Sequence, residues 1–256
     1  MQEVFQTLEK IAPSDLSFVI VGEHGTGKEW IARAIHRMST RQLGPFWPVD
    51  CASFSPENIE KELFGNETMT REGISLNRGA FEDASGGTLL LNEIESLPHT
   101  VQLKVARALE YQTIRRAGDE RDVHINVRVI ATMTESPEAL LNKGKLMKEV
   151  FYRLSPIVLE LPPLRERRED IPLLIETILA DLHTRHNSTV LGISPQALHA
   201  CLEHDWPGNI RNLRNAVEYA SVMCSGQFIQ PQDLPQYVRG NHSGKKSMAA
   251  LAGKKS

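Results

Sequence analysis

A short apolar run followed directly by a glycine-rich loop constrains this chain more than any other feature. Residues 18–21 read Phe-Val-Ile-Val, and residues 22–29 read Gly-Glu-His-Gly-Thr-Gly-Lys-Glu. The loop has the spacing G-x-x-x-x-G-K, and the residues after it have the apolar periodicity of a helix. A strand, a glycine loop and a helix in this order predict a phosphate-binding loop.

The residue types in the loop suit a nucleoside triphosphate. Glycines let backbone N–H groups curl around phosphate oxygens, the amino end of the helix adds its positive dipole, and Lys28 can reach the terminal phosphates. Glu29 stands where Ser or Thr usually follows the lysine, so a hydroxyl ligand for Mg²⁺ is missing. Taken alone, the loop could also be a glycine-rich turn before a helix, without a phosphate. The predicted nucleotide-binding positions of the loop are Gly22, Glu23, Gly25, Thr26, Gly27, Lys28 and Glu29.

Short aliphatic runs alternate with helical patterns before the double proline at 162 and 163, and only helical patterns follow it. This alternation predicts an α/β fold with a parallel sheet and then a small helical domain. The expected domains are 1–163 (nucleotide-binding), 164–238 (helical lid) and 239–256 (flexible linker or tail). The expected strands are 18–21, 46–50, 88–91, 127–131 and 157–161, and the expected later helices are 171–183, 195–203 and 209–223.

Composition sets the class of protein. The 256 residues are 41% hydrophobic and 24% charged with a net charge of −3, which is typical of a globular chain and gives no overall basic field for nucleic acid. No apolar run approaches the roughly 18 residues of a membrane helix, and the first residues do not resemble an export signal. The cysteines, Cys51, Cys201 and Cys224, lack paired spacing and are expected to be reduced and buried. We therefore expect a cytoplasmic protein without membrane contact.

Five segments carry a resemblance to a known family. They are GEHGTGKE (22–29), ELFGNE (62–67), GAFEDASGGTLLLNEIESLP (79–98), LPPLRERREDIPLL (161–174) and WPGNIRNLRNAVE (206–218). In this order and spacing, from about Phe5 to Tyr237, the chain resembles the AAA+ domain of bacterial enhancer-binding proteins, the sigma-54-dependent transcription activators. The resemblance implies a five-stranded αβα domain with a helical lid. It also implies ATP and Mg²⁺ as cofactors and a ring of six or seven copies with ATP between subunits.

Three residues match functional positions of that family. Glu93 stands at the catalytic glutamate that polarises the attacking water, and Arg153 at an arginine that enters the neighbouring subunit's site. Arg211, in a helix that Asn209 is expected to cap, matches a lid arginine that senses the γ-phosphate. The alternatives are a solvated strand end for Glu93 and surface cations for the two arginines.

Two positions depart from the family near the metal. Asn92 replaces the aspartate that positions Mg²⁺ and its waters, so this side chain could serve the ion only indirectly, through a water. Asp50 stands where the family has an asparagine that contacts the catalytic glutamate. The carboxylate and the amide have therefore either traded places between neighbouring strands or changed independently.

Two further departures concern the transition state. Arginines that enter the neighbouring subunit's site are called fingers. Lys148 replaces the family's first finger arginine and offers a point charge in place of a planar fork. Thr134 replaces the sensor asparagine with a shorter side chain. We expect nucleotide binding to survive and ATP hydrolysis to be weak.

The segment that contacts sigma-54 in the family also differs. Residues 69–74, MTREGI, stand in the place of the family's GAFTGA and keep only Gly73 of it. Arg71 beside Glu72 offers no apolar anchor for a partner's pocket. Normal contact with sigma-54 is therefore doubtful, although a shortened loop without consequence is the alternative.

Three functions remain open. The first is an ATP-binding AAA+ module of a transcriptional regulator with weak ATPase activity and no normal sigma-54 contact. The second is a fully active ATPase that remodels sigma-54 RNA polymerase, and the third is an oligomerisation scaffold that binds a nucleotide or second messenger without hydrolysis. The expected partners are further copies of the chain and an RNA polymerase sigma factor. We expect DNA contact only through a domain that this chain does not contain.

Overall fold

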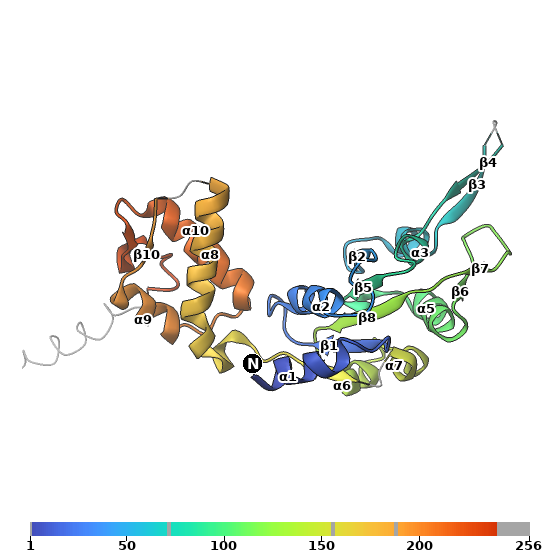
Figure 1. Cartoon of the computed structure of the whole chain (residues 1–256), viewed down its shortest axis with the longest axis horizontal. Helices are drawn as coiled ribbons and strands as arrows, with labels where there is room; N and C mark the ends of the chain where they lie inside the picture. The colour runs from blue at the N-terminus through green and yellow to red at the C-terminus, as the bar shows by residue number, and fades with distance from the viewer. Residues whose placement is uncertain (1, 71–72, 155–156, 187–188, 240–256) are drawn as a thin grey trace, which may run out of the picture. The chain divides into compact units, whose positions relative to one another are not determined.

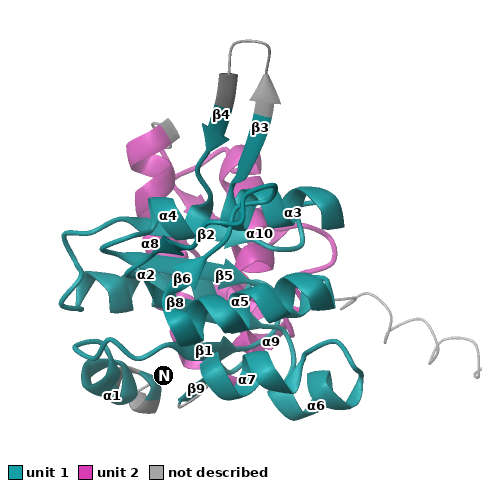
Figure 2. Ribbon diagram, turned by 90° about the vertical axis from the view of Figure 1, so that its right-hand side faces the viewer, with its two compact units in different colours: residues 1–162 teal, residues 163–256 magenta. Residues whose placement is uncertain are grey.

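The chain forms two compact units, residues 1–162 and 163–256, coloured separately in Figure 2. The computed structural model describes residues 2–70, 73–154, 157–186 and 189–239.

A parallel sheet forms the centre of the first unit, as the sequence predicts (Figure 1). Its strand order is β2-β5-β8-β1-β9. The strands are β1 (Phe18–Val21), β2 (Phe46–Asp50), β5 (Thr88–Asn92), β8 (Arg128–Met133) and β9 (Val158–Glu160). Every residue of β1 and β8 is buried, because helices cover both faces of the sheet.

Side chains alternate between two apolar layers along the central strands. In β1, Val19 and Val21 join the larger core, whereas Phe18 and Ile20 join a smaller core on the opposite face. The helices of the unit are α1 (Gln2–Ile11), α2 (Lys28–Arg37), α3 (Pro56–Phe64), α4 (Ala80–Asp83), α5 (His99–Tyr111), α6 (Pro137–Asn142) and α7 (Lys148–Leu154). A short 3₁₀ helix, η1 (Ile94–Ser96), follows β5.

Helix α1 is fastened to the sheet by one buried cation. Arg128, at the start of β8, is 1% exposed. Its guanidinium donates hydrogen bonds to the carbonyl oxygens of Ala12 (2.8 Å), Ile11 (2.9 Å) and Leu16 (3.3 Å). These carbonyls lie at and beyond the end of α1, where helical partners are missing, and Arg128 supplies a donor to each, although Ile11 also accepts from Ser14.

Two hairpins that the sequence did not indicate extend from this unit (Figure 1). One joins β3 (Asn66–Thr70) to β4 (Gly73–Asn77), and the other joins β6 (Thr113–Ile114) to β7 (Val123–His124). The segment between the second pair carries Arg121, whose guanidinium meets Glu67 of β3 at 2.8 Å. The expected solvated pair of Arg71 and Glu72 lies outside the described residues.

The second unit is mainly helical and has its own core around Trp206, which is fully buried and donates a hydrogen bond from Nε1 to the carbonyl of Cys201 at 2.8 Å. A short parallel pair, β10 (Gly192–Ile193) with β11 (Phe228–Ile229), corrects the expectation of helices alone. The helices are η2 (Leu164–Glu166), η3 (Arg168–Asp170), α8 (Ile171–His186), α9 (Pro195–Glu203), α10 (Asn209–Met223) and η4 (Pro231–Asp233).

The cysteines agree with the expectation in two cases of three. Cys51 and Cys201 are buried, and burial raises the pKa of the Cys201 thiol to about 12. Cys224 is only half-buried, because it follows the last turn of α10 at the unit's surface, so the expectation of three buried thiols is wrong there. Among the described residues, no helix is both long and apolar enough to cross a bilayer.

Candidate functional site

The predicted site residues of the first unit lie mainly where three strands end. The glycine loop follows β1, Asn92 ends β5 with Glu93 directly after it, and Thr134 follows β8. These strands are neighbours in one parallel sheet, so their carboxyl ends share one edge. Ligands of open α/β sheets bind at this edge.

The glycine loop has the backbone shape that its sequence predicts. Gly25 and Gly27 have φ angles of 77° and 99°, in the left-handed region where a side chain would be strained. Gly22 packs closely for a different reason, since a Cβ there would lie 2.9 Å from the carbonyl oxygen of Leu161. The loop then runs directly into the amino end of α2. This arrangement can present backbone N–H groups to an anion.

Lys28 lies inside the curve of the loop. It is the first residue of α2 and is only 9% exposed. Its ammonium donates hydrogen bonds to the carbonyl oxygens of Gly22 (2.5 Å) and Glu23 (3.1 Å), and the Thr26 hydroxyl donates to Glu23 at 2.8 Å. The loop therefore concentrates a positive charge and the helix dipole at one place, which suits a phosphate group.

Glu29 lies on the exposed side of α2. Its carboxylate pairs with Arg33, one turn along the same helix, at 2.9 Å. The residue in the usual hydroxyl position is thus held by its own helix.

Glu93 has an unusual backbone and two contacts that fix it. Its φ and ψ of 55° and 56° are left-handed, which is uncommon for a residue with a side chain. Its N–H donates to the hydroxyl of Thr132 at 3.0 Å, and that hydroxyl donates to Asn92 Oδ1 at 3.3 Å. The carboxylate Oε1 lies 2.9 Å from Nδ1 of His24 in the glycine loop. The sequence reasoning missed both Thr132 and His24, since neither belongs to a motif position with a known role.

Asp50 and Asn92 are direct partners in the pairing of β2 with β5. The Asp50 carboxylate accepts hydrogen bonds from the N–H of Ala52 at 3.1 Å and from the hydroxyl of Ser53 at 2.6 Å. The two positions that are expected to depart from the family are therefore adjacent, and the Asp50 carboxylate also accepts bonds from the turn that follows β2.

Thr134 is engaged by a residue that the sequence reasoning missed. Its N–H and its hydroxyl both donate to Oε1 of Glu95, at 2.8 Å and 2.6 Å. The second oxygen of Glu95 is buried and is one of two such side-chain atoms without a hydrogen-bond partner in the described part of the chain. Glu95 thus links η1 to the end of β8.

The two expected finger residues lie on α7, which packs against α5. Lys148 begins this helix and is exposed. Arg153, in its last turn, pairs with Glu110 of α5 at 2.6 Å, and both side chains are partly exposed. An arginine so placed remains accessible from solvent.

Arg211 belongs to the second unit and is exposed in the first turn of α10. The expected capping by Asn209 is wrong, because Gly208 precedes the helix and the Asn209 side chain accepts a hydrogen bond from the N–H of Leu164 at 2.7 Å. Asn209 is fully buried, so its amide serves the core of the unit.

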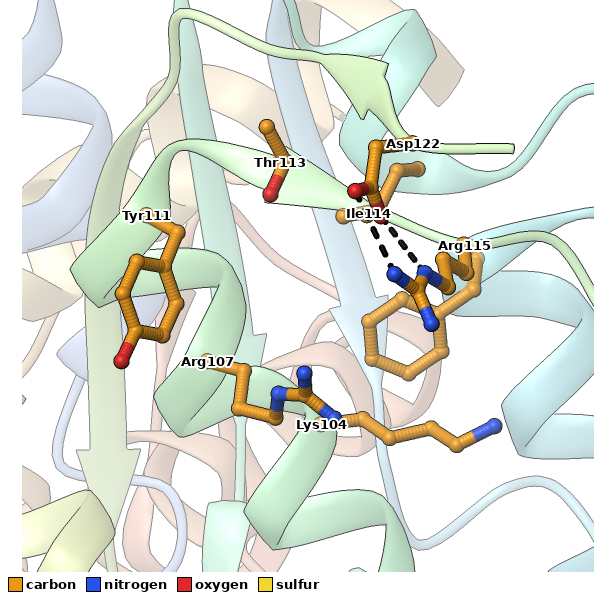
Figure 3. Close-up of a pocket in the computed structure, with 8 residues that line it drawn as sticks. Lys104, Arg107, Tyr111, Thr113, Ile114, Arg115 and Asp122 are labelled. Carbon is orange, nitrogen blue, oxygen red and sulfur yellow. Dashed lines mark hydrogen bonds and ion pairs between the residues drawn. The ribbon is translucent and has the colours of Figure 1, made fainter. Parts of the chain in front are cut away.

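A groove of about 530 Å³ lies elsewhere on the first unit (Figure 3). Its cations are largely neutralised within the chain, since Lys104 pairs with Glu60 at 2.5 Å and Arg115 with Asp122 at 2.6 Å. The groove contains none of the predicted site residues. Its lining consists of Phe64, Lys104, Arg107, Tyr111, Thr113, Ile114, Arg115 and Asp122.

The residues at the strand ends fit a nucleoside triphosphate better than a metal held by protein alone. In the described part of the chain, no three His, Cys, Asp or Glu side chains are grouped as metal ligands. Mg²⁺ commonly takes only one or two carboxylates from the protein and the rest of its ligands from phosphates and water. Asp50 and Asn92 could hold such an ion together with a bound triphosphate.

Comparison with protein families gives two matches. Residues 1–160 match the family described as the Sigma-54 interaction domain, and residues 165–251 match the AAA+ ATPase lid domain.

Similar proteins are bacterial regulators. The chain is 42% identical over 240 residues to the regulatory protein AtoC of Escherichia coli, covering 93% of this chain and 52% of AtoC. It is 39% identical over 236 residues to the transcriptional regulatory protein ZraR of Escherichia coli, covering 92% of this chain and 54% of ZraR. The chain thus spans about half the length of these relatives.

A solved structure has a closely similar fold. NtrX from Brucella abortus, in complex with ATP, superposes with a TM-score of 0.84 at 35% identity. The match covers 93% of this chain and 55% of NtrX.

Proposed function

Because this chain belongs to the Sigma-54 interaction domain family and continues into an AAA+ lid, we propose that it is the ATP-binding module of a bacterial transcriptional regulator. We propose further that it hydrolyses ATP slowly and does not make the usual contact with sigma-54. The relatives AtoC and ZraR are regulatory proteins, and NtrX has been solved with ATP, which supports the first part of the proposal.

The single observation that carries the proposal is the position of Lys28. A buried ammonium inside a loop with two left-handed glycines, at the amino end of a helix, is an arrangement suited to phosphate. On this proposal, the Lys28 ammonium exchanges its bonds to the carbonyls of Gly22 and Glu23 for phosphate oxygens.

The remaining residues have separate roles in the proposed hydrolysis. The Glu93 carboxylate takes a proton from the attacking water, a role that contributes about 10² to 10⁴ in rate. Arg153 of a neighbouring copy stabilises the charge of the transition state, to which such fingers contribute about 10³ to 10⁵. Arg211 senses the γ-phosphate from the lid. Mg²⁺, when bound, would neutralise phosphate charge, and the Asp50 carboxylate and the Asn92 amide oxygen would be the side chains that hold it there.

The weakness of the proposed hydrolysis follows from three substitutions. Asn92 carries no charge, Lys148 cannot form a planar fork, and both Thr134 donors are used by Glu95. Each could reduce the rate by about one to three decades, or about 1.4 to 4 kcal/mol. Because they act on one transition state, the losses need not add.

The proposed loss of sigma-54 contact rests on residues 69–74. This segment keeps only Gly73 of the family's six residues, and its described residues, 69–70 and 73–74, pair with each other in β3 and β4. We propose that Arg71 and Glu72, in the middle of this segment, do not supply the apolar anchor that the usual contact needs. The regulator would then act with another sigma factor or as a repressor.

Turnover at saturating ATP and Mg²⁺, measured beside Glu93→Ala, tests the proposal. We expect a slow rate in the parent and about 10²-fold less in the variant. A fast rate together with stimulated capture of sigma-54 RNA polymerase would favour the fully active remodeller. Nucleotide binding by both proteins, with equal turnover in the parent and in Glu93→Ala, would favour the oligomerisation scaffold.

A further inference from the structure

We propose that His24 is a positioning residue that holds the carboxylate of Glu93 at the mouth of the phosphate loop. This inference rests on the proposed ATP hydrolysis and deepens it. It assigns a role to a loop residue that the G-x-x-x-x-G-K pattern leaves unspecified.

The contact is direct and joins two segments distant in sequence. His24 Nδ1 lies 2.9 Å from Glu93 Oε1, and the two side chains are 62% and 27% exposed. An ionised carboxylate only accepts hydrogen bonds, so Nδ1 is the donor. The imidazole comes from the loop after β1 and the carboxylate from the end of β5.

Glu93 needs such a partner because its backbone contacts do not orient its side chain. The Thr132 hydroxyl accepts the Glu93 N–H and fixes the left-handed backbone. Beyond Cβ, a glutamate has further rotatable bonds, and a partly exposed carboxylate samples several rotamers unless a donor holds it. A general base must lie within hydrogen-bond reach of its water, so this freedom would slow turnover.

Three other polar groups at this edge have partners of their own. Asp50 is an anion that accepts bonds from Ala52 and Ser53, so it cannot donate to a carboxylate. The Lys28 ammonium bonds to loop carbonyls, and the Thr134 hydroxyl donates to Glu95. His24 is the donor that the structure places on Glu93.

The geometry also predicts which kinetic constant depends on His24. The loop would bind phosphate through backbone N–H groups and Lys28, whereas the His24 ring contacts Glu93. Oε1 of Glu93 is engaged by the imidazole, so Oε2 is the oxygen that takes the proton from the attacking water. The water oxygen then bonds to the γ-phosphorus as the bond from that phosphorus to ADP breaks. Loss of the ring should therefore lower kcat and leave ATP affinity unchanged.

The test compares His24→Ala with His24→Asn, whose side-chain NH₂ can occupy the place of Nδ1. We expect His24→Ala to lower kcat about tenfold with ATP affinity within about twofold of the parent, and His24→Asn to return kcat to within about threefold. In a Glu93→Ala background, His24→Ala should have no further effect, because the residue acts through Glu93. His199→Ala, which removes an exposed histidine beside Glu203 in the second unit, is the matched control.

Three results would overturn the inference. They are unchanged or faster turnover in His24→Ala, an equal loss in His24→Asn, and a parent that binds ATP but hydrolyses none. The last result leaves ATP binding standing. A parent that binds no ATP would instead contradict the proposed function itself, so the two failures are distinguishable.

Discussion

At the scale of single residues, the pairing of Asp50 with Asn92 supports the proposal that the two substitutions compensate for each other. Their Cα positions are paired across β2 and β5, so on this proposal the Asp50 carboxylate takes the place of the acid that Asn92 lacks. The Asp50 carboxylate accepts hydrogen bonds from Ala52 and Ser53, and accepting them does not neutralise it. Each of its oxygens can also accept more than one bond, so it can serve a further partner.

Asp50→Asn should weaken binding of the Mg²⁺ complex of ATP about three- to tenfold, because it removes the charge that we assign to the cation. Binding of ATP in EDTA should change little, since Lys28 and the loop are untouched. Ser53→Ala is the control, because it removes a hydrogen bond from the Asp50 carboxylate but keeps its charge. Isothermal titration measures both affinities. Equal Mg²⁺-dependent affinity in Asp50→Asn and the parent would indicate two independent substitutions.

The positions of several site residues could be anticipated because each stands in a pattern. The loop glycines and Lys28 follow from spacing, and Glu93 from the end of an apolar strand. His24, Thr132 and Glu95 could not be found in this way. Their contacts depend on which strands are neighbours and on the left-handed backbone of Glu93, and no local pattern encodes either property.

At the scale of elements, Arg128 joins α1 to the sheet through three carbonyl groups. Arg128→Ala should lower the free energy of unfolding by about 2 to 4 kcal/mol, because buried carbonyls lose a charged donor. Arg37→Ala, at an exposed position of α2, should change it by less than about 0.5 kcal/mol. Urea denaturation followed by circular dichroism measures both. An equally small change in the free energy of unfolding for both variants would show that the Arg128 hydrogen bonds contribute nothing to stability.

The elements themselves were predictable where apolar residues are concentrated. Four strands of the parallel sheet coincide with short aliphatic runs, β2 follows the weaker expectation at 46–50, and α9 and α10 have the expected bounds. The hairpins were not predictable, because residues 66–77 and 113–124 are largely polar and depend on mutual pairing and on ion pairs such as Arg121 with Glu67. The two-residue strands β10 and β11 are too short for any periodicity.

At the scale of the whole molecule, the proposed finger makes hydrolysis a property of the assembly. ATP turnover per chain should therefore rise with protein concentration and then level off. Arg153→Ala should reduce the plateau about 10²-fold or more. Arg185→Ala, which removes an exposed arginine of α8 paired with Asp181, should leave the plateau unchanged. A rate per chain that is independent of concentration would argue against a residue supplied by a neighbour.

The central claim is that the loop and Lys28 bind a nucleoside triphosphate. Equilibrium titration of the purified chain with ATP, beside Lys28→Ala and the exposed-lysine control Lys61→Ala, tests it most directly. We expect saturable binding in the parent and in Lys61→Ala, and affinity at least about tenfold weaker in Lys28→Ala, a loss of about 1.4 kcal/mol or more. Equal affinity in Lys28→Ala, or no binding by the parent at millimolar ATP, would contradict the claim.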